Sequence, residues 1–138
     1  KQALQYGVGD GPASGPRYCT GDVFKYLYQR VARASERSGR SVSIVLLTLR
    51  GKQGGLYPTA RVMTQAMGHI KQLILGGLLR KSDTVARYSR SQFIIMLSVD
   101  KPASARQVME RIREHCAPHL EPLDMEIVFA NTELEPKG

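Results

Sequence analysis

Acidic side chains are scarce in the part of the sequence where basic side chains are most concentrated. The 138-residue chain has 20 Lys and Arg residues against 12 Asp and Glu, a formal net charge of +8. Residues 37–99 hold ten basic side chains and one acidic side chain, Asp83, so this window carries +9 and the rest of the chain −1. Magnesium-dependent phosphoryl transfer usually needs several carboxylates close together, which the window lacks. Its charge instead favours anionic partners such as nucleotides, nucleic acid or an acidic protein surface.

Cysteines and long hydrophobic runs are also few. Cys19 and Cys116 stand alone, with no CxxC pair, which favours a reduced, cytoplasmic protein. No apolar run approaches the ~18–20 residues that a membrane-spanning helix requires. There is no signal-peptide pattern either. We therefore expect neither a membrane partner nor a disulfide framework.

The composition divides the chain into three parts. Residues 1–17 contain four Gly and two Pro without periodicity, which is typical of a flexible linker. Residues 18–131 form the predicted domain, and residues 132–138 form a predicted frayed tail. Because the chain begins with Lys1 rather than Met, we expect it to be a piece of a longer protein whose other domains are its neighbours.

The hydrophobic periodicity predicts alternating strands and helices. Three segments have apolar residues at three- and four-residue spacing and are predicted helices: 20–38, 59–78 and 102–118. Four shorter apolar or alternating segments are predicted strands: 42–49, 84–88, 92–99 and 125–130. The first strand is almost continuously apolar, which indicates burial on both faces.

After the first helix, the order is strand, helix, strand, hairpin, strand, helix, strand. With right-handed crossovers, this βαββαβ order gives an α+β protein with a ferredoxin-like core. We expect an antiparallel sheet covered by helices, with the N-terminal helix as an addition. We expect Pro118 and Pro122 to end the last helix.

The segment from Arg80 to Leu97, RKSDTVARYSRSQFIIML, resembles the central signature of the GGDEF family, the diguanylate cyclases. That signature has an Arg-x-x-Asp, an Ala-Arg-Tyr-like strand, a Gly-Gly-Asp-Glu-Phe turn and then an apolar strand. The predicted βαββαβ core is similar to the family's fold over roughly residues 20–130. The resemblance therefore implies a bacterial signalling domain related to c-di-GMP.

The turn differs from the family pattern at the residues that are catalytic in the family. Where the family has Gly, Gly, Asp or Glu, and then Glu, this sequence has Ser89, Arg90, Ser91 and Gln92. Phe93 matches, and Thr48 stands near the position of the family's metal-binding Asp. Thr, Ser and Gln do not hold Mg²⁺ as carboxylates do. We therefore predict no cyclase activity, no bound metal and no cofactor.

The Arg-x-x-Asp does match the family, whose product-inhibition site it forms. The resemblance thus implies a c-di-GMP site at Arg80 and Asp83, with Arg87, Arg90 and Lys81 neutralising the phosphodiesters. An Arg fork suits the O6/N7 edge of guanine, and a carboxylate accepts from its N1–H and N2–H₂. A structural alternative stays open: Arg80 can interact with a helix C-terminus, and Asp83 can cap a turn.

The interpretation is a non-catalytic regulatory module of a bacterial multidomain protein. Residues 18–49 are similar to C-terminal modules of some bacterial transcription regulators that carry an activator domain. Such a module acts through contacts with neighbouring domains, or as a homodimer. The alternative is a basic nucleic-acid-binding domain of ferredoxin-like fold, for which Tyr88 and Phe93 are the candidate stacking aromatics.

Three residues near the end of the last predicted helix, His115, Cys116 and His119, are of metal-ligating types. Because Pro118 is expected to break the helix between them, we do not predict a metal site there.

Overall fold

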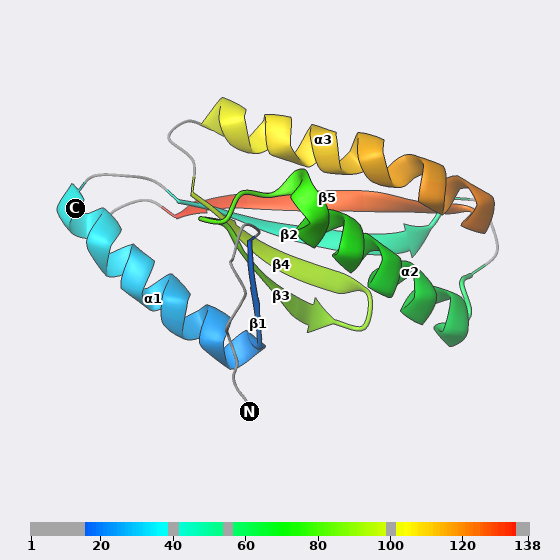
Figure 1. Ribbon diagram of the computed structural model, residues 1–138, viewed down its shortest axis with the longest axis horizontal. Coiled ribbons are helices and arrows are strands. Elements are labelled where there is room, and N and C mark those ends of the chain that lie inside the picture. The colour runs from blue at the N-terminus through cyan, green and yellow to red at the C-terminus, as the bar shows by residue number, and fades with distance from the viewer. Residues whose placement is uncertain (1–15, 39–41, 54–56, 99–101, 135–138) are drawn as a thin grey trace.

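The computed structural model describes residues 16–38, 42–53, 57–98 and 102–134. It contains helices α1 (Gly21–Ser38), α2 (Ala60–Leu73) and α3 (Pro102–Leu120), a π-helical turn η1 (Ile74–Leu78) and a 3₁₀ turn η2 (Glu121–Leu123). Its strands are β1 (Arg17–Cys19), β2 (Val42–Gly51), β3 (Thr84–Ser89), β4 (Gln92–Leu97) and β5 (Met125–Leu134). Figure 1 shows the arrangement.

The strands form one five-stranded sheet in the order β1-β3-β4-β2-β5. All neighbours from β3 to β5 pair antiparallel. With α2 and α3 as the crossover helices, this part is the predicted ferredoxin-like core, so the α+β fold class is confirmed. None of the helices in the described ranges is both long and apolar enough to cross a bilayer.

The strand β1 was not predicted, and it pairs with β3 in parallel. It begins at Arg17, the last residue assigned to the linker, while residues 1–15 lie outside the described residues. The N–H of Arg17 donates to the carbonyl of Asp83 at 3.0 Å. Three residues are too few to show the alternation that identifies a strand, so the pairing left no sequence signal.

The last strand is longer than predicted. β5 continues to Leu134, which pairs with Val42, so three residues of the expected tail belong to the sheet. The predicted strand ended at Ala130 because the next three residues, Asn131, Thr132 and Glu133, are polar. Pairing through the backbone with β2 does not depend on those side chains, which explains the difference.

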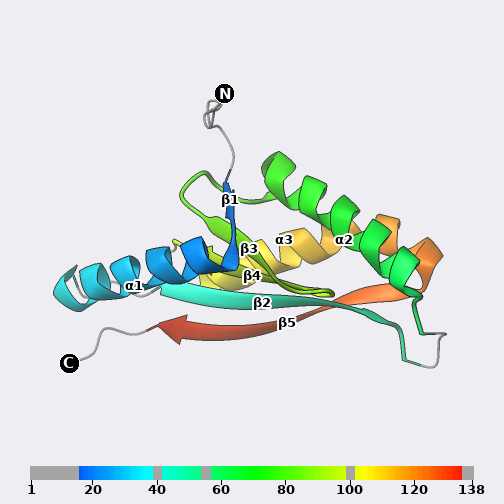
Figure 2. The same cartoon turned by 90° about the horizontal axis from the view of Figure 1, so that it is seen from below.

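The sheet is covered on both faces, by different helices. Alternate β2 residues Val45, Leu47 and Leu49 are at most 1% exposed and pack in the larger core with α2 and α3. The other face packs against α1, where Phe24, Val42, Ala86 and Met96 form a second, smaller core. Figures 1 and 2 show α1 well apart from α2 in both views. On this face, Ile44 is only half-buried, so the predicted burial of β2 is less complete on the side of α1.

Local signals explain most helix boundaries. Thr20 accepts a hydrogen bond from the Val23 N–H at 3.3 Å, and Thr59 accepts one from the Val62 N–H at 3.2 Å, so each caps a helix start. Gly77 has φ 144°, outside the helical range, and ends the helical segment that follows α2.

The prediction that Pro118 ends the last helix is wrong. α3 continues through Pro118 to Leu120, and Pro122 lies in η2. A proline removes one backbone donor and strains the preceding turn. Here the helix continues to Leu120, whose buried side chain packs in the larger core and offsets that cost.

Candidate functional site

The β3–β4 turn contains the residues that differ from the family pattern, and it lies against the end of β2. Ser89 pairs with Gln92 across the turn, with a register irregularity between Arg87 and Ser89. The Ser91 N–H donates to Ser89 Oγ at 3.3 Å, and the Ser91 carbonyl accepts from the Leu49 N–H at 2.9 Å. The turn is therefore fixed to the edge where β2 ends.

A chain of neutral side chains crosses this edge. Ser89 Oγ donates to Gln92 Oε1 at 2.8 Å, and Gln92 Nε2 donates to Thr48 Oγ1 at 3.1 Å. Thr48 and Gln92 are direct cross-strand partners in β2 and β4. Three of the predicted altered positions thus meet, and all three are half-buried. Their polar atoms satisfy one another without any formal charge.

The carboxylate that lies beside the end of β2, that of Glu126, forms an ion pair with Arg50. Glu126 of β5 lies opposite Arg50, and its Oε2 accepts from Arg50 Nε at 2.9 Å. Over the part of the chain that the structure describes, no three His, Cys, Asp or Glu residues group as a metal ion would require. Hydroxyl and amide oxygens alone make a poor Mg²⁺ site.

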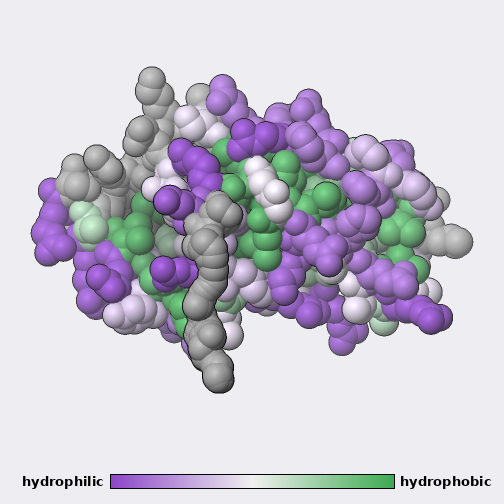
Figure 3. Space-filling view, viewed as in Figure 1, coloured by the Kyte–Doolittle hydropathy of each residue, from purple (hydrophilic) through white to green (hydrophobic). Residues whose placement is uncertain are grey.

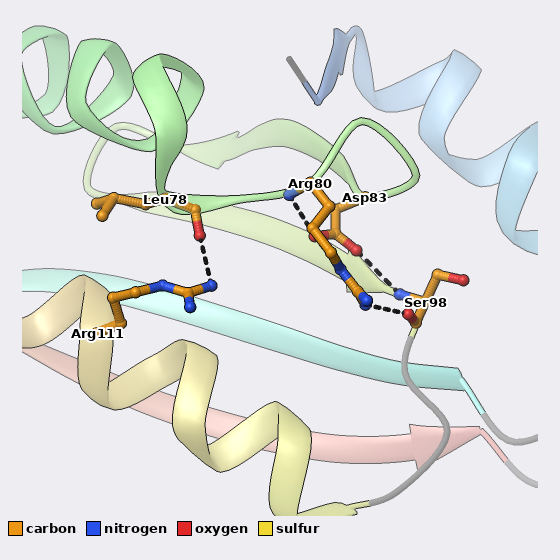
Figure 4. A network of polar contacts seen from close by, with 5 residues as sticks. All are labelled: Leu78, Arg80, Asp83, Ser98 and Arg111. Atoms are coloured by element: carbon orange, nitrogen blue, oxygen red, sulfur yellow. Dashed lines mark hydrogen bonds and ion pairs between the residues drawn. The ribbon is translucent and has the colours of Figure 1, made fainter. Parts of the chain in front are cut away.

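Asp83 lies at the opposite end of β3 from the turn and is 1% exposed. Its Oδ2 accepts from the Arg80 backbone N–H at 2.9 Å, and its Oδ1 accepts from the Ser98 backbone N–H at 3.1 Å. Figure 4 shows that the carboxylate lies between these two segments. The Asp83 N–H also donates to the Arg80 carbonyl at 2.9 Å, which closes the loop. Both carboxylate oxygens therefore stabilise the backbone, as the structural alternative expected.

The side chain of Arg80 is more open. It is 57% exposed, with Nε 3.8 Å from Asp83 Oδ2 and its guanidinium donating to the Ser98 carbonyl. Nearby, the Arg111 guanidinium donates to the Leu78 carbonyl at 3.1 Å and ties α3 to the end of η1 (Figure 4). Ser98 and Arg111 were not predicted as part of this site. Ser98 takes part through its backbone N–H and carbonyl, and Arg111 contacts a backbone carbonyl, so neither contact leaves a residue-type signal in a sequence.

Of the remaining predicted ligand residues, Lys81 lies next to Arg80, whereas Arg87 and Arg90 do not. Lys81 is exposed and lines a hollow of about 280 Å³ that includes Arg17, Ser82 and Ser98. Arg87 and Arg90 are exposed near the turn, where Arg87 Nε donates to the Ser89 carbonyl at 3.1 Å. The six residues of β3 span roughly 20 Å, with Asp83 just before the strand and Arg90 just after it.

Comparison with known proteins agrees with this geometry. The family model described as "Diguanylate cyclase, GGDEF domain" matches residues 62–132, just over half of the chain. The chain belongs to the GGDEF family. The match includes the Arg80–Asp83 loop and the turn at Ser89–Gln92, so the resemblance of this segment is confirmed.

Solved GGDEF structures share the fold. A diguanylate cyclase protein from Thermotoga maritima superposes with a TM-score of 0.64 at 17% identity, covering 89% of this chain and 85% of its own. The GGDEF domain of YfiN, also called TpbB, from Pseudomonas aeruginosa superposes with a TM-score of 0.57 at 13% identity, covering 83% and 75%. A search of curated protein sequences finds no match. At these identities the likeness shows the fold alone.

Two aromatic residues of this GGDEF domain bear on the nucleic-acid alternative. Tyr88 is 62% exposed, whereas Phe93 is 2% exposed and packs in the core under α2 and α3. RNA-recognition sheets stack bases on aromatics that share one exposed face. Tyr88 and Phe93 do not form such a pair, so this geometry does not support the stacking hypothesis.

The two histidines near the end of α3, His115 and His119, contact different residues. His119 lies against His69 of α2, with ring centroids 4.3 Å apart, while His115 Nδ1 is 2.9 Å from the Arg111 carbonyl. Cys116 is buried, and burial raises the pKa of its thiol to about 11. Burial also raises the pKa of Cys19, partly offset by Arg17. Neither thiol is activated as a nucleophile at neutral pH.

Proposed function

We propose that this GGDEF domain is a non-catalytic regulatory module of a bacterial, cytoplasmic multidomain protein, such as a transcription regulator, and that it acts through contacts with neighbouring domains. The observation that carries the proposal is the hydrogen-bonded chain from Ser89 through Gln92 to Thr48. Two of its members, Gln92 and Thr48, stand at or near positions at which the family resemblance implies carboxylates.

Cyclisation of GTP requires the neutralisation of charge on a triphosphate and on the developing transition state. Enzymes of phosphoryl transfer do this with divalent metal ions held by carboxylates and with precisely aimed cations. These uncharged side chains supply no anionic ligand, and they are hydrogen-bonded to one another. Arg90 adds bulk in a turn where the family has glycine, and the nearby Glu126 is neutralised by Arg50. These features support a module without cyclase activity.

The test is turnover of GTP by the purified chain with Mg²⁺ or Mn²⁺, followed by chromatography for c-di-GMP. The expected result is no product above the background without enzyme. A companion variant replaces Thr48 with Asp and Ser91 and Gln92 with Glu, to show whether carboxylates alone restore activity. Metal-dependent turnover by the unaltered chain, abolished by EDTA, would overturn the proposal.

A second candidate function is the binding of c-di-GMP at the Arg80–Asp83 loop. It is favoured by the exposed Arg80 guanidinium and by the cationic side chains of Arg17 and Lys81 at the adjacent hollow. These groups suit phosphodiesters. The engaged, buried carboxylate of Asp83 weighs against a guanine contact at that residue, so the site would act through its arginine and lysine side chains.

Calorimetry with c-di-GMP decides this second candidate. Binding to the unaltered chain that is weakened by Arg80→Ala, but not by Arg106→Ala on α3, would support it. Both residues are exposed arginines, so the control removes the same charge elsewhere. No heat at high micromolar ligand would leave the contact-mediated module as the function.

A further inference from the structure

Two histidines from different helices are in contact on the surface of the helical layer. His69 lies on α2 and His119 lies in the last turn of α3, and their ring centroids are 4.3 Å apart, with the ring planes inclined by 57°. Both residues are exposed. Figure 1 shows α2 and α3 on the same side of the sheet, and Figure 3 shows mainly hydrophilic residues on the part of the surface where α3 ends. The pair is therefore accessible to solutes.

The separation of the two rings suits a shared metal ion. An ion held by two imidazoles lies about 2.1 Å from each bound nitrogen, so the two nitrogens are at most about 4 Å apart. Rings whose centroids lie 4.3 Å apart meet this condition once each turns a nitrogen toward a common point. Exposed histidines can turn in this way, because the χ2 torsion of His has broad energy wells. Coordination therefore requires rotation of side chains and no rearrangement of the helices.

The type of ligand determines the class of ion. Neutral imidazole suits Zn²⁺, Ni²⁺ and Cu²⁺, whereas Mg²⁺ and Ca²⁺ prefer oxygen ligands. Within the ranges that the structure describes, no group of three or more His, Cys, Asp or Glu residues includes this pair, so water completes the coordination. A structural zinc site has more protein ligands than this pair offers. The expected site is thus exchangeable, with micromolar rather than nanomolar affinity.

The electrostatic surroundings favour a cation at the pair. Because His119 lies in the last turn of α3, it is close to the negative end of the helix dipole. The basic residue nearest to His69 along α2 is Lys71, whose Nζ lies over the Tyr18 ring, 4.0 Å from the centroid. Residues two apart on a helix point to different sides, so this ammonium group does not face the histidines. A divalent ion there gains from the helix dipole without repulsion from Lys71.

We propose that His69 and His119 together bind one divalent transition-metal ion of the class that includes zinc, and that the ion fastens α2 to α3. The site goes beyond the proposed function, because neither histidine lies in the altered β3–β4 turn or in the loop before β3. It also differs from the sequence cluster of His115, Cys116 and His119, since its second ligand comes from another helix.

Calorimetric titration with ZnCl₂, in a buffer that does not bind metal, measures the affinity. We expect one-to-one binding with a dissociation constant of about 100 µM or below, and no heat of binding with MgCl₂. In ¹H–¹⁵N spectra of the histidine rings, the signals of His69 and His119 should shift together and saturate, while that of His115 stays in place. A dissociation constant above about 1 mM, or shifts confined to His115, would overturn the proposal.

The third histidine of the chain provides a matched control. His69→Gln and His119→Gln are each expected to weaken Zn²⁺ binding about tenfold or more, because each leaves a single imidazole at the site. His115→Gln removes an exposed histidine from the same helix as His119, one whose Nδ1 lies 2.9 Å from the Arg111 carbonyl. This control is expected to bind Zn²⁺ within about twofold of the unaltered chain. Equal loss in all three variants would indicate binding to separate histidines and would overturn the site.

Urea unfolding tests whether the packing of α2 against α3 builds the site. An ion that binds the folded chain and not the unfolded one stabilises the fold by mass action. A saturating concentration of ZnCl₂ should therefore raise the unfolding midpoint of the unaltered chain and of His115→Gln, but not that of His69→Gln or His119→Gln. All three histidines are exposed, so the variants are expected to fold as the unaltered chain does. An unaltered chain whose midpoint does not respond to ZnCl₂ would overturn the proposal and leave the proposed function standing.

Discussion

The buried carboxylate of Asp83 accepts a hydrogen bond from the backbone N–H of Ser98, so it joins the loop before β3 to the residue after β4. With the second bond from the Arg80 N–H, the side chain fixes both outer ends of the β3–β4 hairpin. The Arg-x-x-Asp segment is therefore a structural element of this domain.

Replacing Asp83 should consequently destabilise the domain. Asp83→Ala leaves two backbone donors unsatisfied in a buried position, which costs about 2–4 kcal/mol of unfolding free energy. Asp83→Asn keeps one acceptor and should cost about half as much. Urea denaturation measures both, with Glu114→Ala on the exposed side of α3 as the control. A change of less than about 0.5 kcal/mol for Asp83→Ala would contradict this role.

The Gln92–Thr48 hydrogen bond should appear as a coupling energy. In a double-mutant cycle with Thr48→Val and Gln92→Leu, we expect the two changes to be non-additive by about 0.5–1.5 kcal/mol. The reason is that either substitution already removes the 3.1 Å bond between the side chains. Urea unfolding of the four proteins gives the value. Additive effects would mean that the two side chains act independently.

The order of the main elements and the family were predictable because long periodic segments carry strong signals. The strand β2 and the helix α2 have runs of apolar residues with clear spacing, and the segment Arg80–Leu97 keeps a recognisable pattern on both sides of the altered turn. β1 was missed because three residues have no periodicity. The end of β5 was missed because Asn131, Thr132 and Glu133 interrupt the apolar pattern, although their backbone pairs with β2.

The contacts of the candidate site residues were only partly predictable from the sequence. That Thr48, Ser89 and Gln92 meet follows from strand order, since the end of β2 pairs with the start of β4. The burial of Asp83 does not follow from sequence, because its partners are the backbone groups of Arg80 and Ser98. Any residue except proline offers that donor.

Two adjacent glycines at the end of η1 should respond differently to alanine. Gly77 has φ 144°, which a residue with a Cβ rarely adopts, so Gly77→Ala should cost about 1–3 kcal/mol. Gly76 lacks such a φ, and a Cβ there would meet no atom within 4 Å. Gly76→Ala should therefore be neutral or stabilising by up to about 1 kcal/mol. Thermal or urea unfolding compares the two, and an equal cost at both positions would contradict the strain argument.

The buried thiol of Cys116 should make stability fall at alkaline pH. Its pKa is raised by burial to about 11, above the ordinary value of 9.0. Between these values the unfolded chain loses the thiol proton while the folded chain keeps it, so raising the pH favours unfolding. The unfolding free energy should decline from pH 9 toward pH 11, and less steeply in Cys116→Ala. Lysines that titrate in this range affect both proteins, so the difference in slope between them is the measurement. Equal slopes would mean that the thiol ionises alike in the folded and unfolded chains.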